Sequence, residues 1–215
     1  MYVNQQIEPR RSQAQRRAAT RRTLLDAARA VFRDQGYAAT TTEEVVRRAA
    51  VTRGALYHHF DDKRDLFRAV IEEIEIEIDQ HVQSAAEGAT DPVRAFIAGT
   101  DAFLDRCLEP DVKQIFLLDG PAVLGWQEWH AIDVKHAVVQ IELGLQELIS
   151  AGCLDPQPVR PLAILLHGAL IEAALVIAAA DQPEAERAAL GASLLRLLGL
   201  DAAFPTPPHR ATAEP

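Results

Sequence analysis

The sequence predicts an all-α protein with a small N-terminal helical domain followed by a larger helical domain. Apolar residues recur at helical spacing, as in Ile71, Ile74 and Ile78. Residues 74–79 also alternate with the period of a strand, but no glycine or proline interrupts residues 55–87, which favours one long helix over residues 63–86. Further helices are expected over residues 92–107, 111–118, 122–151, 158–180 and 183–200, with a turn at Asp119-Gly120-Pro121.

Residues 40–60 have the pattern of a helix-turn-helix. The first helix begins at Thr41 or Thr42, where the sequence TTEE fits a capping box. Thr52 is placed to cap the second helix, in which Leu56 and Phe60 lie one turn apart and can point inward. The pattern therefore predicts where the two helices begin and which residues of the second helix are buried.

The outer face of the second helix has side chains that suit a DNA major groove. Arg53 offers a fork that pairs with guanine, and Gly54 has no bulk to hold the helix N-terminus away from a duplex. Thr41, Thr42, Tyr57 and Lys63 are expected at phosphates. The alternative is a plain helical hairpin with a solvated polar face. The expected DNA-contacting residues are Thr41, Thr42, Thr52, Arg53, Gly54, Tyr57, His58 and Lys63.

Two longer segments surround this motif, LLDAARAVFRDQGYAATTTEEV and VTRGALYHHFDDKRDLFRAV. With them, residues 24–70 resemble the DNA-binding domain of the tetracycline-repressor (TetR) family of bacterial regulators. Two positions depart from the usual helix-turn-helix pattern. Val46 stands where a small Ala is usual, and Ala50 stands where the turn asks for positive φ and Gly is usual. We expect the geometry to differ from the family pattern at these two positions.

Charge is divided unevenly along the chain. Residues 1–70 contain 14 Lys and Arg and 8 Asp and Glu, a net charge of +6, so the overall charge of −9 leaves −15 for residues 71–215. The basic end can neutralise phosphates. Three arginine pairs concentrate this charge: Arg10-Arg11, Arg16-Arg17 and Arg21-Arg22.

The expected domains follow from these patterns. Residues 1–19 form a basic arm that could follow phosphates or enter a minor groove, or else a disordered soluble tail. The helix-turn-helix domain covers residues 20–68, and an effector-binding and dimerisation domain covers residues 69–200. Residues 201–215, rich in proline, are expected to be a disordered tail.

Residues 162–180 are apolar on nearly every face and must therefore be covered on all sides. In the family that the N-terminus resembles, the last two long helices usually pair with their copies. The resemblance thus implies a homodimer that binds a palindromic operator in double-stranded DNA. The alternative is the central core helix of a monomer. The expected interface residues are Leu162, Leu166, Ala169, Leu170, Ala173, Leu194, Leu197 and Leu198.

The region between the long helix and these last helices is the expected site of a small-molecule effector. Trp126, Trp129 and His130 share one helix face, and aromatic walls with a few polar groups would suit a mostly apolar ligand. Ordinary core packing is the alternative. The candidate ligand-binding residues are Phe96, Phe103, Phe116, Trp126, Trp129, His130, His167 and Glu172.

The sequence lacks the motifs of several classes of enzyme, metal site and membrane protein. No glycine-rich phosphate loop, G-x-S-x-G or HExxH is present, so no catalytic residue is assigned and no enzyme is expected. The histidines show no metal-ligand spacing, and Cys107 and Cys153 fit no metal or redox pattern, so neither a metal nor a cofactor is expected. No apolar stretch reaches the length of about 18 residues that a membrane span needs.

The combined prediction is a bacterial cytoplasmic, nucleoid-associated DNA-binding regulator. The resemblance implies a repressor that leaves its operator when a small molecule binds the C-terminal domain. An activator of the same fold and an architectural DNA-binding protein without an effector are the alternatives.

Overall fold

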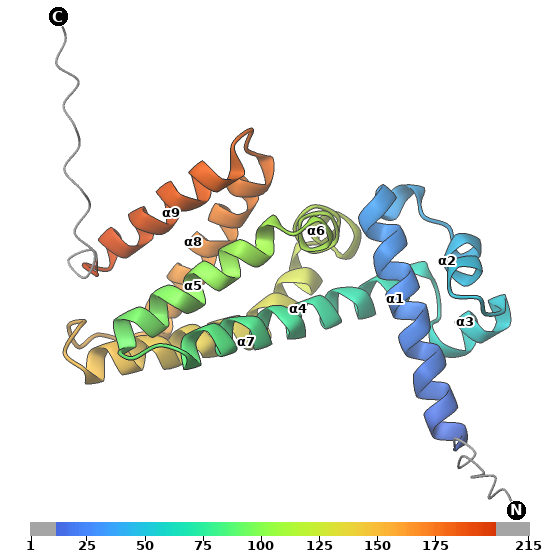
Figure 1. Ribbon diagram of the computed structural model, residues 1–215, viewed down its shortest axis with the longest axis horizontal. Coiled ribbons are helices and arrows are strands. Elements are labelled where there is room, and N and C mark those ends of the chain that lie inside the picture. Colours follow the sequence, from blue (N-terminus) through green and yellow to red (C-terminus); the bar gives the residue numbers. More distant parts are fainter. Residues whose placement is uncertain (1–11, 201–215) are drawn as a thin grey trace, which may run out of the picture.

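A computed structural model describes residues 12–200, and every regular element in that range is a helix, which confirms the all-α prediction (Figure 1). The first three helices and the start of the fourth form a small N-terminal body that contains the helix-turn-helix. The rest of the fourth helix and the later helices form a second, larger body beside it. The elements in chain order are α1 (Gln13–Ala39), α2 (Thr42–Arg48), α3 (Arg53–His59), α4 (Lys63–Glu87), α5 (Pro92–Leu108), the π-helix η1 (Val112–Asp119), α6 (Gly120–Leu124), α7 (Trp126–Ser150), α8 (Val159–Ala179) and α9 (Pro183–Leu197).

Helix α4 belongs to both bodies. It starts after α3 and ends in the larger body, packed along α5 (Figure 1). Its buried residues, among them Leu66, Ile71 and Ile78, keep the helical spacing seen in the sequence. The boundary expected after residue 68 therefore lies within a continuous helix, and α4 can transmit a displacement from one body to the other.

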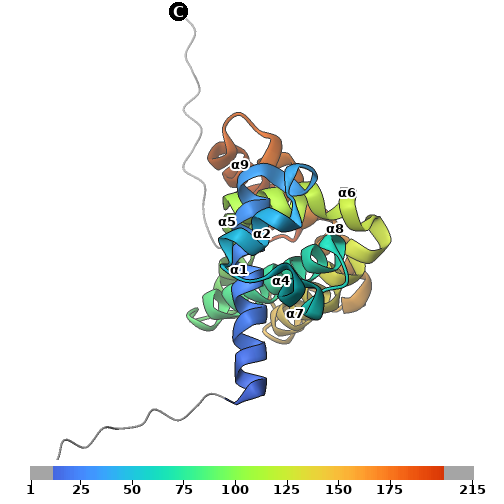
Figure 2. The same cartoon turned by 90° about the vertical axis from the view of Figure 1, so that its right-hand side faces the viewer.

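Two apolar clusters form the core. The first runs from α1 through Phe32 and Phe67 to Phe116 and Trp129, so one apolar cluster extends from the N-terminal body into the larger one. The second holds α5, α7, α8 and α9 together around residues such as Leu145. Turned by 90°, the molecule shows α1 crossing the other helices and projecting past them toward its N-terminal end (Figure 2).

The segment around residues 119–125 differs from the sequence prediction. Asp119-Gly120-Pro121 is not a turn, because Gly120 keeps helical dihedral angles and η1 continues directly into α6. A side chain at Gly120 would lie 2.6 Å from Trp129 Cδ1, so the glycine is needed for close packing. The break lies instead at Gly125, with φ of 79°, and it divides the helix predicted over residues 122–151.

The start of α1 also differs from the prediction. Ser12 and Gln15 form a capping box, so the helix begins at Gln13 and includes residues 13–19 of the expected arm. Arg16 and Arg17 are thus helical. Arg10-Arg11 and the predicted tail at residues 201–215 lie outside the described residues.

Candidate functional site

The turn between α2 and α3 has the predicted positive φ at a non-glycine residue. Ala50 has φ of 52°, and it follows a helix end in which Val51 N–H donates to Val46 C=O at 3.1 Å and Ala50 N–H donates to Arg47 C=O at 3.2 Å. This pair of bonds satisfies two carbonyls at the end of α2. Val46 packs against the core at half burial. The turn therefore closes despite both departures from the usual pattern.

Both helices of the motif begin at the threonines predicted to cap them. Thr41 Oγ1 accepts from Glu44 N–H and Thr52 Oγ1 accepts from Ala55 N–H, each at 3.2 Å. A full capping box would also have the Glu44 carboxylate accept a hydrogen bond from the Thr41 backbone N–H. In the structure this carboxylate instead accepts from Gln35 Nε2 at 2.7 Å. That bond connects α2 to α1.

The outer face of α3 is solvent-exposed as predicted. Leu56 and Phe60 are buried, whereas Thr52, Arg53, Gly54, Tyr57 and His58 are exposed. A side chain at Gly54 would meet nothing closer than Thr52 Oγ1 at 4.0 Å, so open space lies before the N-terminus of α3. This arrangement leaves the start of α3 free to approach a duplex.

Arg53 is oriented by two neighbours. Its Nη1 lies 3.0 Å from Glu43 Oε1 of α2, and its guanidinium lies 5.5 Å from the Tyr57 ring centre. A hydrogen bond from Thr42 and then one from Arg53 lower the pKa of Tyr57. Because Arg53 and Glu43 are more than half exposed, their ion pair is open to exchange with an incoming phosphate or base.

The N-terminal part of α1 adds positive charge beside α3. Arg21 lies over the Phe60 ring at 5.3 Å. Burial first, and then the charges of His58, Arg17 and Arg21, lower the pKa of His59. The positive charge of this surface therefore comes from the arginines of α1, which lie beside the histidines of α3.

Lys63 has an internal role that the sequence did not suggest. Its Nζ donates to the carbonyls of Tyr37 and Thr40, both at 2.9 Å, and lies 4.0 Å from the Tyr37 ring centre. These contacts secure the C-terminal end of α1. The phosphate contact expected of Lys63 stays a prediction.

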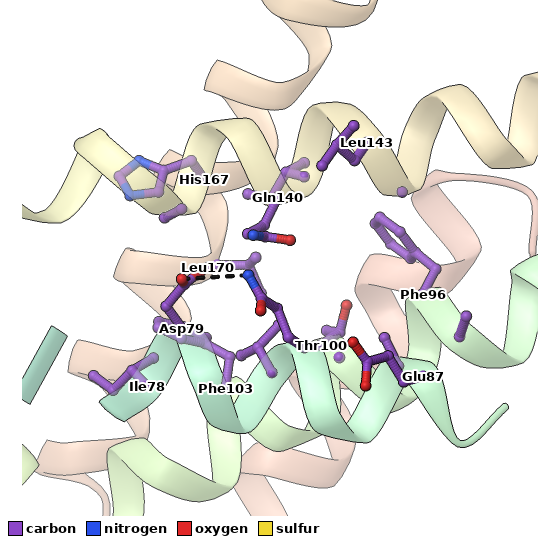
Figure 3. Close-up of a pocket in the computed structure, with 18 of the residues that line it drawn as sticks. Ile78, Asp79, Glu87, Phe96, Thr100, Phe103, Gln140, Leu143, His167 and Leu170 are labelled. Carbon is purple, nitrogen blue, oxygen red and sulfur yellow. Dashed lines mark hydrogen bonds between the residues drawn. The ribbon is translucent and has the colours of Figure 1, made fainter. Parts of the chain in front are cut away.

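The larger body contains a cavity of about 390 Å³ between α4, α5, α7 and α8 (Figure 3). Phe96, Phe103 and Leu170 supply apolar walls, and Thr100 and Gln140 supply polar groups. Figure 3 shows His167 at one end of the cavity and Phe96 with Glu87 toward the other. The position agrees with the predicted effector region.

Only three of the eight candidate ligand residues line this cavity: Phe96, Phe103 and His167. Phe116 and Trp129 are buried in the first core cluster, because the small Gly120 lets the indole pack against the chain. Trp126 and Glu172 are exposed elsewhere. These four residues and His130 do not line this cavity.

The charged residues that line the cavity are all acidic: Glu75, Asp79, Glu87 and Glu147. Glu75 is 4% exposed, and its burial, followed by the charges of Asp133 and Asp79, raises its pKa well above the ordinary range. Gln83 Nε2 donates to Asp79 at 3.4 Å. The cavity is thus apolar on its walls and negative in its charge.

His130, Asp133 and His167 come together next to the cavity. Asp133 and His167 are buried, and one ligand-type atom from each of the three residues lies within 4.8 Å of the others. Asp133 is not among the candidate ligand-binding residues predicted from the sequence. In the sequence, the spacing of three residues between His130 and Asp133 indicates that both lie on one face of a helix. His167 lies on α8 and comes close to them because α8 packs on α7.

Most of the residues predicted for the dimer interface on α8 and α9 are covered by the chain itself. Leu166, Leu170 and Leu194 are buried in the chain's own core, and Leu162, Ala173 and Leu198 are half-buried against it. Of the eight predicted residues, Ala169 and Leu197 are exposed. The exposed apolar residues of α8 are instead Ile164, Leu165, Ala169, Val176 and Ala179.

Helix α8 is long and apolar enough, by length and composition, to cross a membrane, although His167 and Glu172 interrupt its apolar run. Its buried residues pack against α5, α7 and α9. A core helix of a soluble protein meets the same length and composition test.

Comparison with known proteins identifies the family. The chain matches the bacterial regulatory proteins of the tetR family over residues 24–70 and the tetracyclin repressor-like C-terminal domain over residues 93–200. A TetR-family transcriptional regulator from Pectobacterium atrosepticum is 38% identical, with a TM-score of 0.77 over 88% of this chain and 97% of that chain. The chain belongs to the TetR family.

Two further similar proteins extend the comparison. The Transposon Tn10 TetC protein of Escherichia coli is 26% identical over 162 residues, which are 75% of this chain and 82% of that protein. FadR of Bacillus subtilis, solved in complex with stearoyl-CoA, is 18% identical with a TM-score of 0.68 over 82% of this chain and 96% of that chain. The FadR likeness shows the TetR fold alone. The resemblance of residues 24–70 to the family is confirmed, and this TetR-family chain is a DNA-binding transcriptional regulator.

Proposed function

We propose that this TetR-family protein is a cytoplasmic, nucleoid-associated repressor that leaves a palindromic operator when a small molecule enters the cavity. The observation that supports this most directly is the course of α4. Its N-terminal end follows α3 after three residues, and its C-terminal half forms a wall of the cavity from Glu75 to Glu87. A ligand that moves this wall would change the position of α3 on DNA, with a typical coupling of about 1–3 kcal/mol.

DNA contact is assigned to the exposed start of α3 and the caps before it. Arg53 is the proposed base-reading residue, since its fork reaches solvent and its exposed ion pair with Glu43 can open. Thr41, Thr42, Thr52, Tyr57 and His58 surround it, and Gly54 allows close approach. Arg17 and Arg21 of α1 extend the basic surface toward the neighbouring phosphates.

Homodimerisation is assigned to the exposed apolar face of α8 together with α9. Leu165 is 71% exposed and Leu197 is 81% exposed, and large apolar side chains left in water mark an association surface. A two-fold axis through this face would place two copies of α3 on one side of a duplex. Their centres would then be about 34–36 Å apart, or a multiple of that distance.

The cavity indicates the chemistry of the effector. Its apolar walls favour a mostly apolar molecule, and its acidic residues favour one with a positive charge or several hydrogen-bond donors. The cavity also favours a ligand-responsive regulator over an architectural DNA-binding protein, which has no use for one.

The test combines DNA binding with a variant that fills the cavity. Thr100 is 8% exposed and lines the cavity, so Thr100→Met should occupy the ligand volume, while Thr90→Met at an exposed site is the matched control. A library of apolar amines is screened by fluorescence anisotropy of operator DNA. We expect some compounds to release wild-type protein and the Thr90→Met variant from operator DNA but not the Thr100→Met variant. Equal release of all three proteins would refute the assignment of the cavity as the effector site.

A further inference from the structure

Three buried polar atoms meet between α7 and α8. Asp133 Oδ2 lies 2.8 Å from His167 Nε2 and 4.0 Å from His130 Nδ1. None of the three atoms has a hydrogen-bond partner among the described residues, although Asp133 Oδ2 and His167 Nε2 lie within ion-pair distance. A buried polar group without a partner costs about 1–3 kcal/mol, so three at one point require an explanation.

The residue types match one class of ligand. Two imidazoles and a carboxylate bind divalent transition-metal ions, whereas Ca²⁺ and Mg²⁺ prefer oxygen ligands alone. Ligand atoms about 2.1 Å from a tetrahedral ion lie roughly 3.4 Å from one another. The present atoms lie within 4.8 Å of one another, so an ion would need to draw the most distant pair together by up to roughly 1.4 Å.

We propose that His130, Asp133 and His167 bind a divalent first-row transition-metal ion, with Zn²⁺ as the reference case.

The surrounding residues hold the ligands in place for this role. His130 and Asp133 are one turn apart on α7, and the His130 ring stacks on Trp126 with centres 5.2 Å apart and planes inclined by 10°.

The site lies at the end of the cavity marked by His167 in Figure 3. Three protein ligands leave a fourth position of a tetrahedral ion open. His167 and Glu75 both line the cavity, so the ion would stand beside the volume assigned to the effector. Metal binding itself requires neither DNA nor effector.

The test measures Zn²⁺ directly on untagged, full-length protein after chelator treatment and dialysis. Equilibrium dialysis followed by elemental analysis should give one zinc ion per chain. The near-isosteric Asp133→Asn and the His167→Gln variant should weaken binding roughly 100-fold or more, since even second-shell changes cost about 10–100-fold. His81→Ala, at an exposed position on α4, is the matched histidine control and should bind as wild type.

A Co²⁺ titration provides the second measurement. Bound Co²⁺ should give visible ligand-field absorption and quench tryptophan fluorescence, because Trp126 stacks on His130. Circular dichroism checks that each variant is folded; if a buried variant unfolds, His130→Ala, with its side chain 40% exposed, replaces it. Absence of stoichiometric metal in wild type, or equal binding in all ligand variants, would overturn the proposal. Neither outcome bears on the repressor function, since no DNA enters the measurement.

Discussion

Arg29 of α1 and Asp111, the cap of η1, form an ion pair with Nη2 and Oδ2 2.6 Å apart. The same guanidinium lies 2.7 Å from Glu77 of α4. Arg29 is 20% exposed and thus links the helix that supports the helix-turn-helix to two elements of the larger body. With Tyr37 N–H donating to Asp119 at 2.8 Å, this contact fixes how the two bodies are oriented.

Replacing Arg29 by Met should destabilise the protein by about 1–3 kcal/mol, because two partly buried carboxylates lose their partner. Urea unfolding measures the change. Arg33→Met is the control, since Arg33 is 43% exposed and, within residues 12–200, forms its ion pair with the adjacent Asp34. Equal stability of Arg29→Met and wild type would show that the pair does not hold the bodies together.

The Arg29–Asp111 pair should also be visible in the pH dependence of stability. Burial raises the pKa of Asp111, but the hydrogen bond and charge of Arg29 outweigh it, so the pKa is lowered from 3.8. The stabilisation is therefore fully present above the unfolded pKa and is lost as pH falls through the folded pKa. The difference in unfolding free energy between wild type and Asp111→Asn should be constant near neutral pH and shrink below about pH 4. A difference that grows on acidification would contradict this sign.

Ala50→Gly should stabilise the protein, which is unusual for a glycine substitution. The left-handed conformation at φ of 52° costs Ala about 1–2 kcal/mol. Glycine removes that cost but adds about 0.4–1 kcal/mol of unfolded-chain entropy, so a net gain of about 0.5–1 kcal/mol is expected. Ala49→Gly, at φ of −74°, should instead lose stability. Thermal unfolding of both variants measures the two signs.

Arg53→Ala should weaken binding to the operator by roughly 10-fold or more and relax the preference at one base pair. Competition against operators changed at single positions measures both effects at fixed salt. Arg47→Ala is a control on α2, since Arg47 is 77% exposed and lies outside the start of α3. If Arg53→Ala kept wild-type affinity and base preference, its base-reading role would be excluded.

The helix-turn-helix could be predicted from sequence because its determinants are local. Thr41 and Thr52 cap their helices through residues three positions away, and Ala50 follows the end of its own helix. The fold class followed from the same short-range patterns. The extent of α1 was the exception, since the Ser12–Gln15 capping box was not recognised.

The sites in the larger body could not be predicted in the same way. Helix α8 is apolar on all faces, so its sequence has no polar side to show which leucines point inward, and Leu166 and Leu170 were assigned to the wrong face. The cavity wall and the His130–Asp133–His167 group depend on how α7 and α8 pack, which no spacing within either helix reveals.

Sequence-specific binding to an operator is tested by selecting the fragments that the protein binds from a random duplex library and measuring their affinity at fixed salt. We predict one palindromic motif with half-site centres one helical turn, or a multiple of it, apart. We also predict that this motif is bound at least about 1000-fold more tightly than random DNA. No enriched motif, or equal affinity for the selected and random duplexes, would contradict sequence-specific operator binding.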